Sequence, residues 1–541
     1  MFEKILNKNI ILITFFVCVI LFSIFKSLIF AIYTLDHHHS TLVFYDAYQL
    51  GNGYSLFKDI IVIYGVLTTL IHHFFLKLFG NFVLSLSIGT AVIYSSSFLI
   101  FFFILKNLSF SRINSIIIIS IIFLIHPSIV LPWADYNSYF FLLLGLLLFT
   151  SPSNNIFSYY FFGICLGVAV LSRQTTFLPI FLFLLFTFFF KNLKKKRVNI
   201  IFGILTIFSI FFFYLLSKDL IYDWFIQSFK TWTIFTYKNF HPLINETLGY
   251  LNYFILIKDL LVKLCTSFAN FDLKWGFYFL LLIFNIYFLI DTILFKKRFQ
   301  KDYKLILISF MSIMLFSQSM HINEIFRLST GSIIGIIPLS ICLKDLLKKF
   351  SIFFRKIIFF MTFFLFIFFV FSSINRSYKN YEIIKNTSKN LSESKISFLK
   401  YQKFPEEVTN FYEKFNSEMF KISSLYKINY SYNFSDNSLL PIISKLKNPL
   451  ISSYYNLTGL SEQSDFVNLY KYYPNLNFIE LLKKYPDDVV AFVIVKNENE
   501  IIALKEKIIF KNFYIFSELN YPLNEINNTL LILLPKNVKF K

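Results

Sequence analysis

The stretch IIVIYGVLTTLIHHFFLKLF, residues 60–79, decides the topology of this chain. It is apolar enough to be a membrane-spanning helix, but its polar residues recur at helical spacing and fall on one face. Those residues are Tyr64, Thr68, Thr69, His72, His73 and Lys77. A helix with one polar face is typical of a segment that lies flat in the membrane interface. The pattern therefore leaves two interpretations, a span or an interfacial helix.

The rest of the chain has the composition of a polytopic membrane protein. Of its 541 residues 56% are hydrophobic and only 15% are charged. Apolar runs of about 17–25 residues recur, which is enough to cross a hydrocarbon core about 30 Å thick. Apart from residues 60–79, we expect eleven spans, at residues 9–33, 81–105, 113–131, 137–151, 155–172, 175–190, 198–217, 277–295, 305–320, 331–347 and 356–374.

The basic loops choose between the two interpretations. If residues 60–79 crossed the membrane, the loops with Lys106, Arg112 and the run 191–197 would face outward. If the segment lies flat, they face the cytoplasm, as the positive-inside rule requires. We therefore predict eleven spans, with the N-terminus inside and the C-terminal region outside. The net charge of +21 then reflects topology, and we expect no nucleic-acid partner.

The last part of the chain differs in character. Residues 376–541 are more polar, with two candidate buried strands, VVAFVIVK (489–496) and LLILLP (530–535), and a helix-like stretch at 462–484. We expect a water-soluble α/β or α+β domain there. The predicted division is a transmembrane domain at 1–375, with outer loops at 34–80 and 218–275, and an extracytoplasmic domain at 376–541.

Four polar clusters fall on the predicted outer face. Charge at the membrane boundary is costly unless it is solvated or paired, so these clusters are functional candidates. A carboxylate can take a proton from an attacking hydroxyl, and Lys or Arg can stabilise the charge on a departing phosphate. The clusters are Asp36 with His37 and His38; Lys58 with Asp59 and Tyr64; Asp135; and Arg173 with Glu324 and Arg327.

Each cluster also has a structural interpretation. Asp135 could be a solvated helix cap, and Arg173 an interfacial anchor whose side chain extends to water. Glu324 and Arg327, three residues apart, could form an ion pair on a helix surface. These alternatives stay open at the level of sequence.

Metal binding is weakly indicated. The adjacent residues His37, His38 and His39 cannot all point at one ion, and no zinc motif is present, so we predict no dedicated metal site. A divalent cation such as Mg²⁺ or Mn²⁺, held by Asp36 and Asp135, is the open alternative. The four cysteines are scattered and form no disulfide framework.

Three segments together resemble the GT-C superfamily of membrane glycosyltransferases, which use polyprenyl-phosphate sugars. The first outer loop has an acid directly after the first span, then GNGYSLFKDIIVIYG (51–65) and a helix ending in LFG (78–80). ADYNSYFFLLLGLLLF (134–149) resembles the second outer loop and the following span. FFGICLGVAVLSRQTTFLPI (161–180) resembles the hairpin with a basic residue. Bacterial aminoarabinose transferases and protein O-mannosyltransferases are relatives in that superfamily.

The resemblance implies roles for particular residues. Asp36 would be the catalytic acid of the first loop and Asp135 that of the second, while Lys58 and Arg173 would contact the lipid phosphate. The resemblance is weaker at Arg327, because HINEIFRL (321–328) is not the familiar late motif of the superfamily. The chain also departs from the usual pairing after the first span, since it has Asp36-His37 in place of Asp-Glu.

The resemblance also implies an activity. The chain would transfer a sugar from a polyprenyl-phosphate donor to a hydroxyl of a lipid, a cell-envelope glycan or a protein, at the periplasmic face of a bacterial inner membrane. A transporter or flippase of lipid-linked saccharides, or a polymerase or ligase of them, is the alternative. Nearly all charge lies at span ends, whereas a transporter needs charge along a path within its spans, which favours the enzyme.

Overall fold

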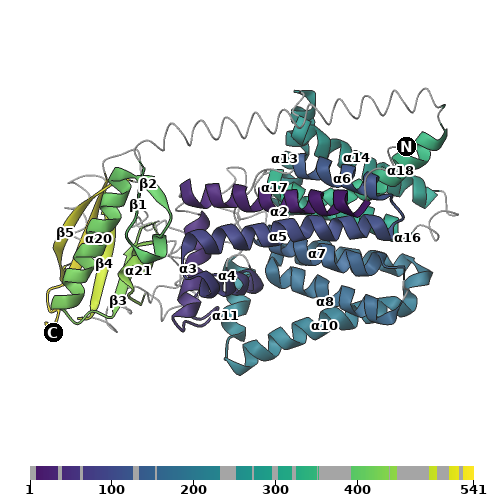
Figure 1. The fold of residues 1–541 in the computed structure, drawn as a ribbon. Helices are drawn as coiled ribbons and strands as arrows, with labels where there is room; N and C mark the ends of the chain where they lie inside the picture. The colour runs from purple at the N-terminus through teal and green to yellow at the C-terminus, as the bar shows by residue number, and fades with distance from the viewer. Residues whose placement is uncertain are drawn as a thin grey trace.

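The chain folds into a bundle of helices with a small β-domain at one end (Figure 1). The computed structural model describes residues 8–33, 39–60, 62, 65–125, 133–152, 155–231, 252–270, 273–294, 303–319, 325–349, 351, 391–435, 437, 439–447, 487–495, 511–522 and 528–541. The chain is a multi-pass membrane protein.

The bundle helices overlap ten of the predicted spans. Over the described residues, four stretches are long and apolar enough to cross a membrane: Leu12–Tyr33, Phe82–Asn107, Lys191–Ser217 and Trp275–Leu294. Shorter apolar helices lie between them, and the predicted span 356–374 lies outside the described residues. The bundle consists of α2 (Lys8–Tyr33), α5 (Phe82–Asn107), α6 (Arg112–Ile125), α7 (Ala134–Thr150), α8 (Ile156–Ser172), α9 (Phe177–Phe186), α10 (Lys194–Ser217), α14 (Leu273–Leu294), α16 (Tyr303–Leu315) and α18 (Ile336–Lys349).

Small residues and internal hydrogen bonds let these apolar helices pack. A side chain on Gly163 of α8 would collide with the backbone of Ile200 in α10, and one on Gly203 would collide with that of Tyr160. Such close backbone contact is the usual way in which helices associate in lipid. Buried hydroxyls bond to their own helix, as Ser97 Oγ does to the carbonyl of Ile93 (2.8 Å).

The segment between α2 and α5 holds a helix that the sequence did not predict. Helix α3 (His39–Gly51) lies across the ends of α2 and α5 (Figure 1). Within the stretch 60–79, predicted to be one helix, α4 covers only Val66–Phe79. It begins later because Gly65, with φ of 125°, holds a conformation that ends the preceding turn.

Part of the predicted polar face of α4 points inward. Thr68, Thr69 and His72 are buried against the bundle, whereas Leu70, Phe74 and Lys77 are exposed. His72 stacks on Phe44 of α3, with ring centroids 5.3 Å apart. These buried polar residues of α4 therefore make protein contacts.

The segment after α10 and the late part of the bundle contain shorter elements. These are α11 (Ile221–Phe225), α13 (Asn252–Ala269) and α17 (Ile325–Ser329). Just after α11, Gln227 bonds to the segment before α4: its amide nitrogen donates to the carbonyl of Phe57 (2.5 Å) and its oxygen accepts from the backbone of Val62 (3.1 Å). The segments before α4 and after α11 are therefore joined.

The C-terminal domain is a mixed sheet covered by helices. Its four-stranded sheet has the order β3-β4-β6-β5, with β3 parallel to β4 and the other pairs antiparallel. The two predicted strands are confirmed as β4 and β6, which are central neighbours. The elements are β1 (Leu391–Glu393), β2 (Lys403–Pro405), α20 (Glu406–Leu425), β3 (Tyr430–Phe434), α21 (Leu439–Ser444), β4 (Val489–Val495), β5 (Phe513–Tyr521) and β6 (Asn528–Pro535). The helix predicted at 462–484, and the boundary predicted at 375, lie outside the described residues.

Helix α3 connects this domain to the bundle. Tyr45 belongs to the apolar core of the C-terminal domain, and the ring of Tyr48 lies 6.0 Å from that of Phe398. Phe398 also contacts Phe82 of α5, with ring centroids 6.2 Å apart. The domain therefore sits on the end of the bundle that carries the first outer loop.

Candidate functional site

Two predicted site residues meet because α7 and α8 form a hairpin (Figure 1). Asp135 lies in the first turn of α7, and Arg173 directly follows the last residue of α8. In an antiparallel pair these two positions are neighbours. The Arg173 guanidinium forms an ion pair with the Asp135 carboxylate. Both residues are buried, with exposures of 5% and 3%.

A third predicted residue comes from much later in the chain. Arg327 of α17 places Nη1 3.9 Å from Oδ2 of Asp135 and is 6% exposed. Burial rules out two of the structural interpretations: Asp135 is not a solvated cap, and Arg173 does not extend to water. Glu324, the residue with which Arg327 could form an ion pair, lies outside the described residues.

The cluster contains two arginines. Arg173 and Arg327 each supply a positive charge that a guanidinium does not lose in proteins, and both lie at the Asp135 carboxylate. Charge at membrane depth is costly and is retained where it serves function. Guanidinium groups match the oxygens of an anionic group such as a phosphate.

Residues that the sequence did not single out hold Arg173 in place. Its Nε donates to Thr175 Oγ1 (2.7 Å) and its Nη2 to the carbonyl of Gln318 (3.2 Å). The Gln318 amide donates to Thr176 Oγ1 (2.9 Å), which also bonds to the hydroxyl of Ser138 (2.9 Å). The guanidinium thus has a fixed orientation, which is what recognition of a charged group requires.

Helix α4 braces the hairpin. Thr68 Oγ1 donates to the carbonyl of Ser172 (2.8 Å) and accepts from the Asn137 amide (3.1 Å). Gly65 permits this approach, because a side chain there would collide with the Ser172 carbonyl. The inward polar face of α4 therefore sets the position of Arg173, the residue after Ser172.

Replacing Gly65 with Ala should damage this brace. The new side chain would meet the Ser172 backbone and require a backbone conformation that only glycine adopts easily. We expect a loss of stability above about 3 kcal/mol. Gly80, at the other end of α4, is the matched control: its φ is also positive (70°), but nothing lies within 4 Å. Gly80→Ala should cost only about 1–2 kcal/mol. The unfolding temperatures of the two variants are compared in the same detergent. Equal losses of stability would contradict a special role for the contact between Gly65 and Ser172.

Two other predicted site residues, Lys58 and Asp59, interact elsewhere. Lys58 is exposed, and its charge acts on Asp223 of α11. Burial raises the pKa of the Asp223 carboxyl, and Lys58 opposes that rise. The Asp59 carboxylate accepts from the Ser55 backbone (2.8 Å), a local turn contact. Outside the described residues lie Asp36, His37, His38, Tyr64 and Glu324.

A buried acid that the sequence analysis missed lies in α3. Asp46 is 8% exposed, and burial raises the pKa of its carboxyl well above the usual value. Gln49, one turn later, is 3% exposed, and neither its amide nitrogen nor its oxygen has a hydrogen-bond partner. Neither Asp46 nor Gln49 was among the predicted site residues.

The described residues provide no set of ligands for a divalent cation. Within the described ranges no group of three or more His, Cys, Asp or Glu could hold an ion. Of the predicted pair, Asp135 faces two guanidinium groups, which compete with a cation for its oxygens. The positive charge of this cluster is supplied by arginine.

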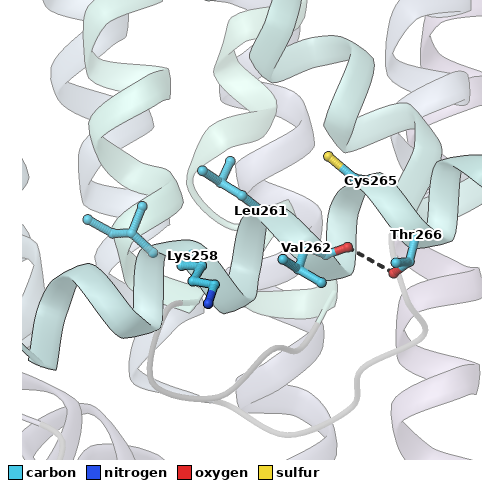
Figure 2. A pocket seen from close by; sticks show the side chains of 6 residues that line it. Lys258, Leu261, Val262, Cys265 and Thr266 are labelled. Carbon is cyan, nitrogen blue, oxygen red and sulfur yellow. Dashed lines mark hydrogen bonds between the residues drawn. The ribbon is translucent and has the colours of Figure 1, made fainter.

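A hollow of about 550 Å³ lies elsewhere, along α13. Figure 2 shows its side chains along this one helix, with the Thr266 hydroxyl bonded to the Val262 carbonyl (2.8 Å). None of the predicted site residues lines it. The lining residues are Ile257, Lys258, Leu261, Val262, Cys265 and Thr266. It is an apolar groove on the helix surface, separate from the charged cluster.

Solved structures resemble the chain closely in fold. No protein-family model and no curated protein sequence matches it. The apo crystal structure of ArnT from Cupriavidus metallidurans is 10% identical, with a TM-score of 0.52 over 96% of this chain and 97% of that chain. ArnT bound to undecaprenyl phosphate is 10% identical, with a TM-score of 0.49 over 97% and 98%. The oligosaccharyltransferase AglB from Archaeoglobus fulgidus, with an inhibitory peptide and a dolichol-phosphate, is 12% identical, with a TM-score of 0.45 over 88% and 69%.

The match to apo ArnT extends over nearly the whole of both chains. It includes the membrane bundle and the C-terminal β-domain. The chain therefore has the fold of ArnT over nearly its whole length.

Proposed function

We propose that this chain, which has the fold of ArnT, is a glycosyltransferase that uses a polyprenyl-phosphate sugar. It would transfer the sugar to a hydroxyl of a lipid, an envelope glycan or a protein. The reaction would take place at the outer, periplasmic face of a bacterial inner membrane. ArnT is itself a protein that binds undecaprenyl phosphate.

The observation that carries the proposal is the buried pair of arginines. The guanidinium groups of Arg173 and Arg327 both lie at the Asp135 carboxylate, and Arg is the side chain whose geometry best matches phosphate oxygens. The phosphate of a polyprenyl-phosphate sugar would bind at these two arginines. Its hydrocarbon tail would remain in the membrane beside the apolar outer face of α4.

The proposed reaction is a single displacement with inversion. The acceptor hydroxyl attacks the anomeric carbon, the bond from that carbon to the phosphate oxygen breaks, and the polyprenyl phosphate departs with the electron pair. The hydroxyl proton goes to a carboxylate, for which Asp36 is the candidate. Arg173 and Arg327 stabilise the negative charge that grows on the phosphate. Asp135 acts through them as a positioning residue.

The test is a transfer assay with the full-length protein in nanodiscs. Radiolabelled decaprenyl-phosphate pentoses and hexoses are supplied with an envelope extract as acceptor, with EDTA, Mg²⁺ or Mn²⁺ in parallel. The proposal predicts a labelled product and one equivalent of decaprenyl phosphate for each sugar transferred. A flippase would instead move the intact donor across a vesicle membrane without releasing decaprenyl phosphate, and that result would contradict the proposal.

A further inference from the structure

Asp46 and Gln49 form an unusual pair of buried polar side chains. They are three residues apart on α3, so they share one face of the helix. Both are more than nine-tenths buried, and the amide nitrogen and oxygen of Gln49 have no hydrogen-bond partner within the described part of the chain. Buried polar groups are almost always hydrogen-bonded. A buried carboxyl beside an amide that lacks partners therefore needs an explanation.

The neighbours of α3 define where the pair points. Phe44 and Ala47 pack toward α4 and α5, and Tyr45 packs into the C-terminal domain. Leu50 packs against the apolar residues of the 54–62 loop. With 100° between successive residues, Asp46 and Gln49 lie between the Tyr45 side and the Leu50 side. The pair therefore points into the seam between the C-terminal domain and the first-loop turn.

Helix α4 contacts both α3 and the α7–α8 hairpin. His73 Nδ1 of α4 lies 3.0 Å from the carbonyl oxygen of Ala47 in α3. One turn earlier, Thr68 bonds to Ser172 and Asn137, beside the Arg173–Asp135 pair. The helix that carries Asp46 and Gln49 and the hairpin that carries the charged cluster therefore both pack on α4.

The chemistry of the pair selects one class of ligand. A neutral carboxyl has one donor and an acceptor, and a carboxamide has two donors and an acceptor. Sugar hydroxyls donate and accept in the same way, so two of them can satisfy both side chains. A hydrocarbon tail would leave these polar atoms unsatisfied.

We propose that Asp46 and Gln49 bind hydroxyl groups of the sugar that is transferred, next to the donor phosphate held by the arginines. This inference rests on the proposed function and adds a specificity site to it. Because the Gln49 amide lacks partners within the described part of the chain, a donor sugar with the matching hydroxyls gains hydrogen bonds that a deoxy sugar cannot make.

The test compares donors in the transfer assay. For the decaprenyl-phosphate sugar that the wild type uses best, Asp46→Ala and Gln49→Ala should each raise KM tenfold or more. Their KM for the matching single-deoxy donor should change less than threefold. Asp46→Asn keeps a donor and an acceptor and should stay within threefold of the wild type on both donors. Asn52→Ala, at an exposed position directly after α3, is the control and should change neither.

The outcomes separate this inference from the proposed function. If the wild type transfers no sugar from any donor, both the proposed function and the Asp46–Gln49 subsite are wrong. If it transfers sugar but the Ala variants keep the wild-type preference for the hydroxylated donor, only the Asp46–Gln49 subsite is wrong. A loss of activity that is equal on both donors, together with a lower unfolding temperature, would show a structural role and also overturn it.

Discussion

Replacing Arg173 with Gln should lower sugar transfer about 10²–10³-fold, which is the usual effect of removing one preorganised donor from a developing negative charge. The Arg173 guanidinium is buried against Asp135 and oriented by Thr175 and the Gln318 carbonyl. A neutral amide leaves Arg327 as the one guanidinium near Asp135. The fall should appear in kcat more than in KM, because the phosphate gains its full charge only as the bond breaks.

Two further variants sharpen this prediction. Arg173→Lys keeps the charge but loses the fork that matches a phosphate, so it should recover part of the activity. Arg197→Gln is the matched control, because Arg197 also donates to main-chain carbonyls, those of Thr187 (2.8 Å) and Phe190 (3.3 Å). Its activity should stay within about threefold of wild type, since surface or remote changes have small effects. Equal losses at positions 173 and 197 would show that the effect is not specific to the site.

Replacing Asp135 with Asn should reduce transfer at least about 100-fold and also destabilise the protein. The change leaves two buried guanidinium groups without their carboxylate, and breaking a buried ion pair by removing one partner costs about 3–5 kcal/mol. The unfolding temperature and the rate of transfer should therefore fall together.

The double variant Asp135→Asn/Arg173→Gln distinguishes stability from function. Removing both partners relieves the unpaired charge, so the unfolding temperature should rise again, with a coupling of about 0.5–3 kcal/mol. Transfer should not recover, because the phosphate still lacks Arg173. A double variant that regained activity along with stability would contradict the role of the arginine.

Charge pattern and hydropathy predicted several residues of this site from the sequence. Asp135, Arg173 and Arg327 stand out in the sequence because charge is rare beside apolar runs, and the structure joins these three. The spans follow for the same reason. Their partners were not visible: Gln318 and Thr176 are uncharged residues whose contact is formed only by the packing of distant helices.

Helix α3 shows why a local pattern was not enough. Its stretch HSTLVFYDAYQLG (39–51) is rich in β-branched and aromatic residues, which have low helix propensity. It is stabilised by contacts with α5 and the C-terminal domain, through Phe44 and Tyr45. Asp46 was missed along with the helix, because burial of an acid is a tertiary property. The late start of α4 likewise depends on the meeting of Gly65 with Ser172.

One measurement tests the central claim most directly: the release of decaprenyl phosphate from a radiolabelled decaprenyl-phosphate sugar by the purified full-length protein with acceptor extract. The account predicts one equivalent of decaprenyl phosphate for each labelled sugar on the acceptor. It also predicts that Arg173→Gln, folded by its unfolding temperature, releases about 10²–10³-fold less. Equal release by the wild type and Arg173→Gln, or no release by a folded wild type with any pentose or hexose donor, would contradict it.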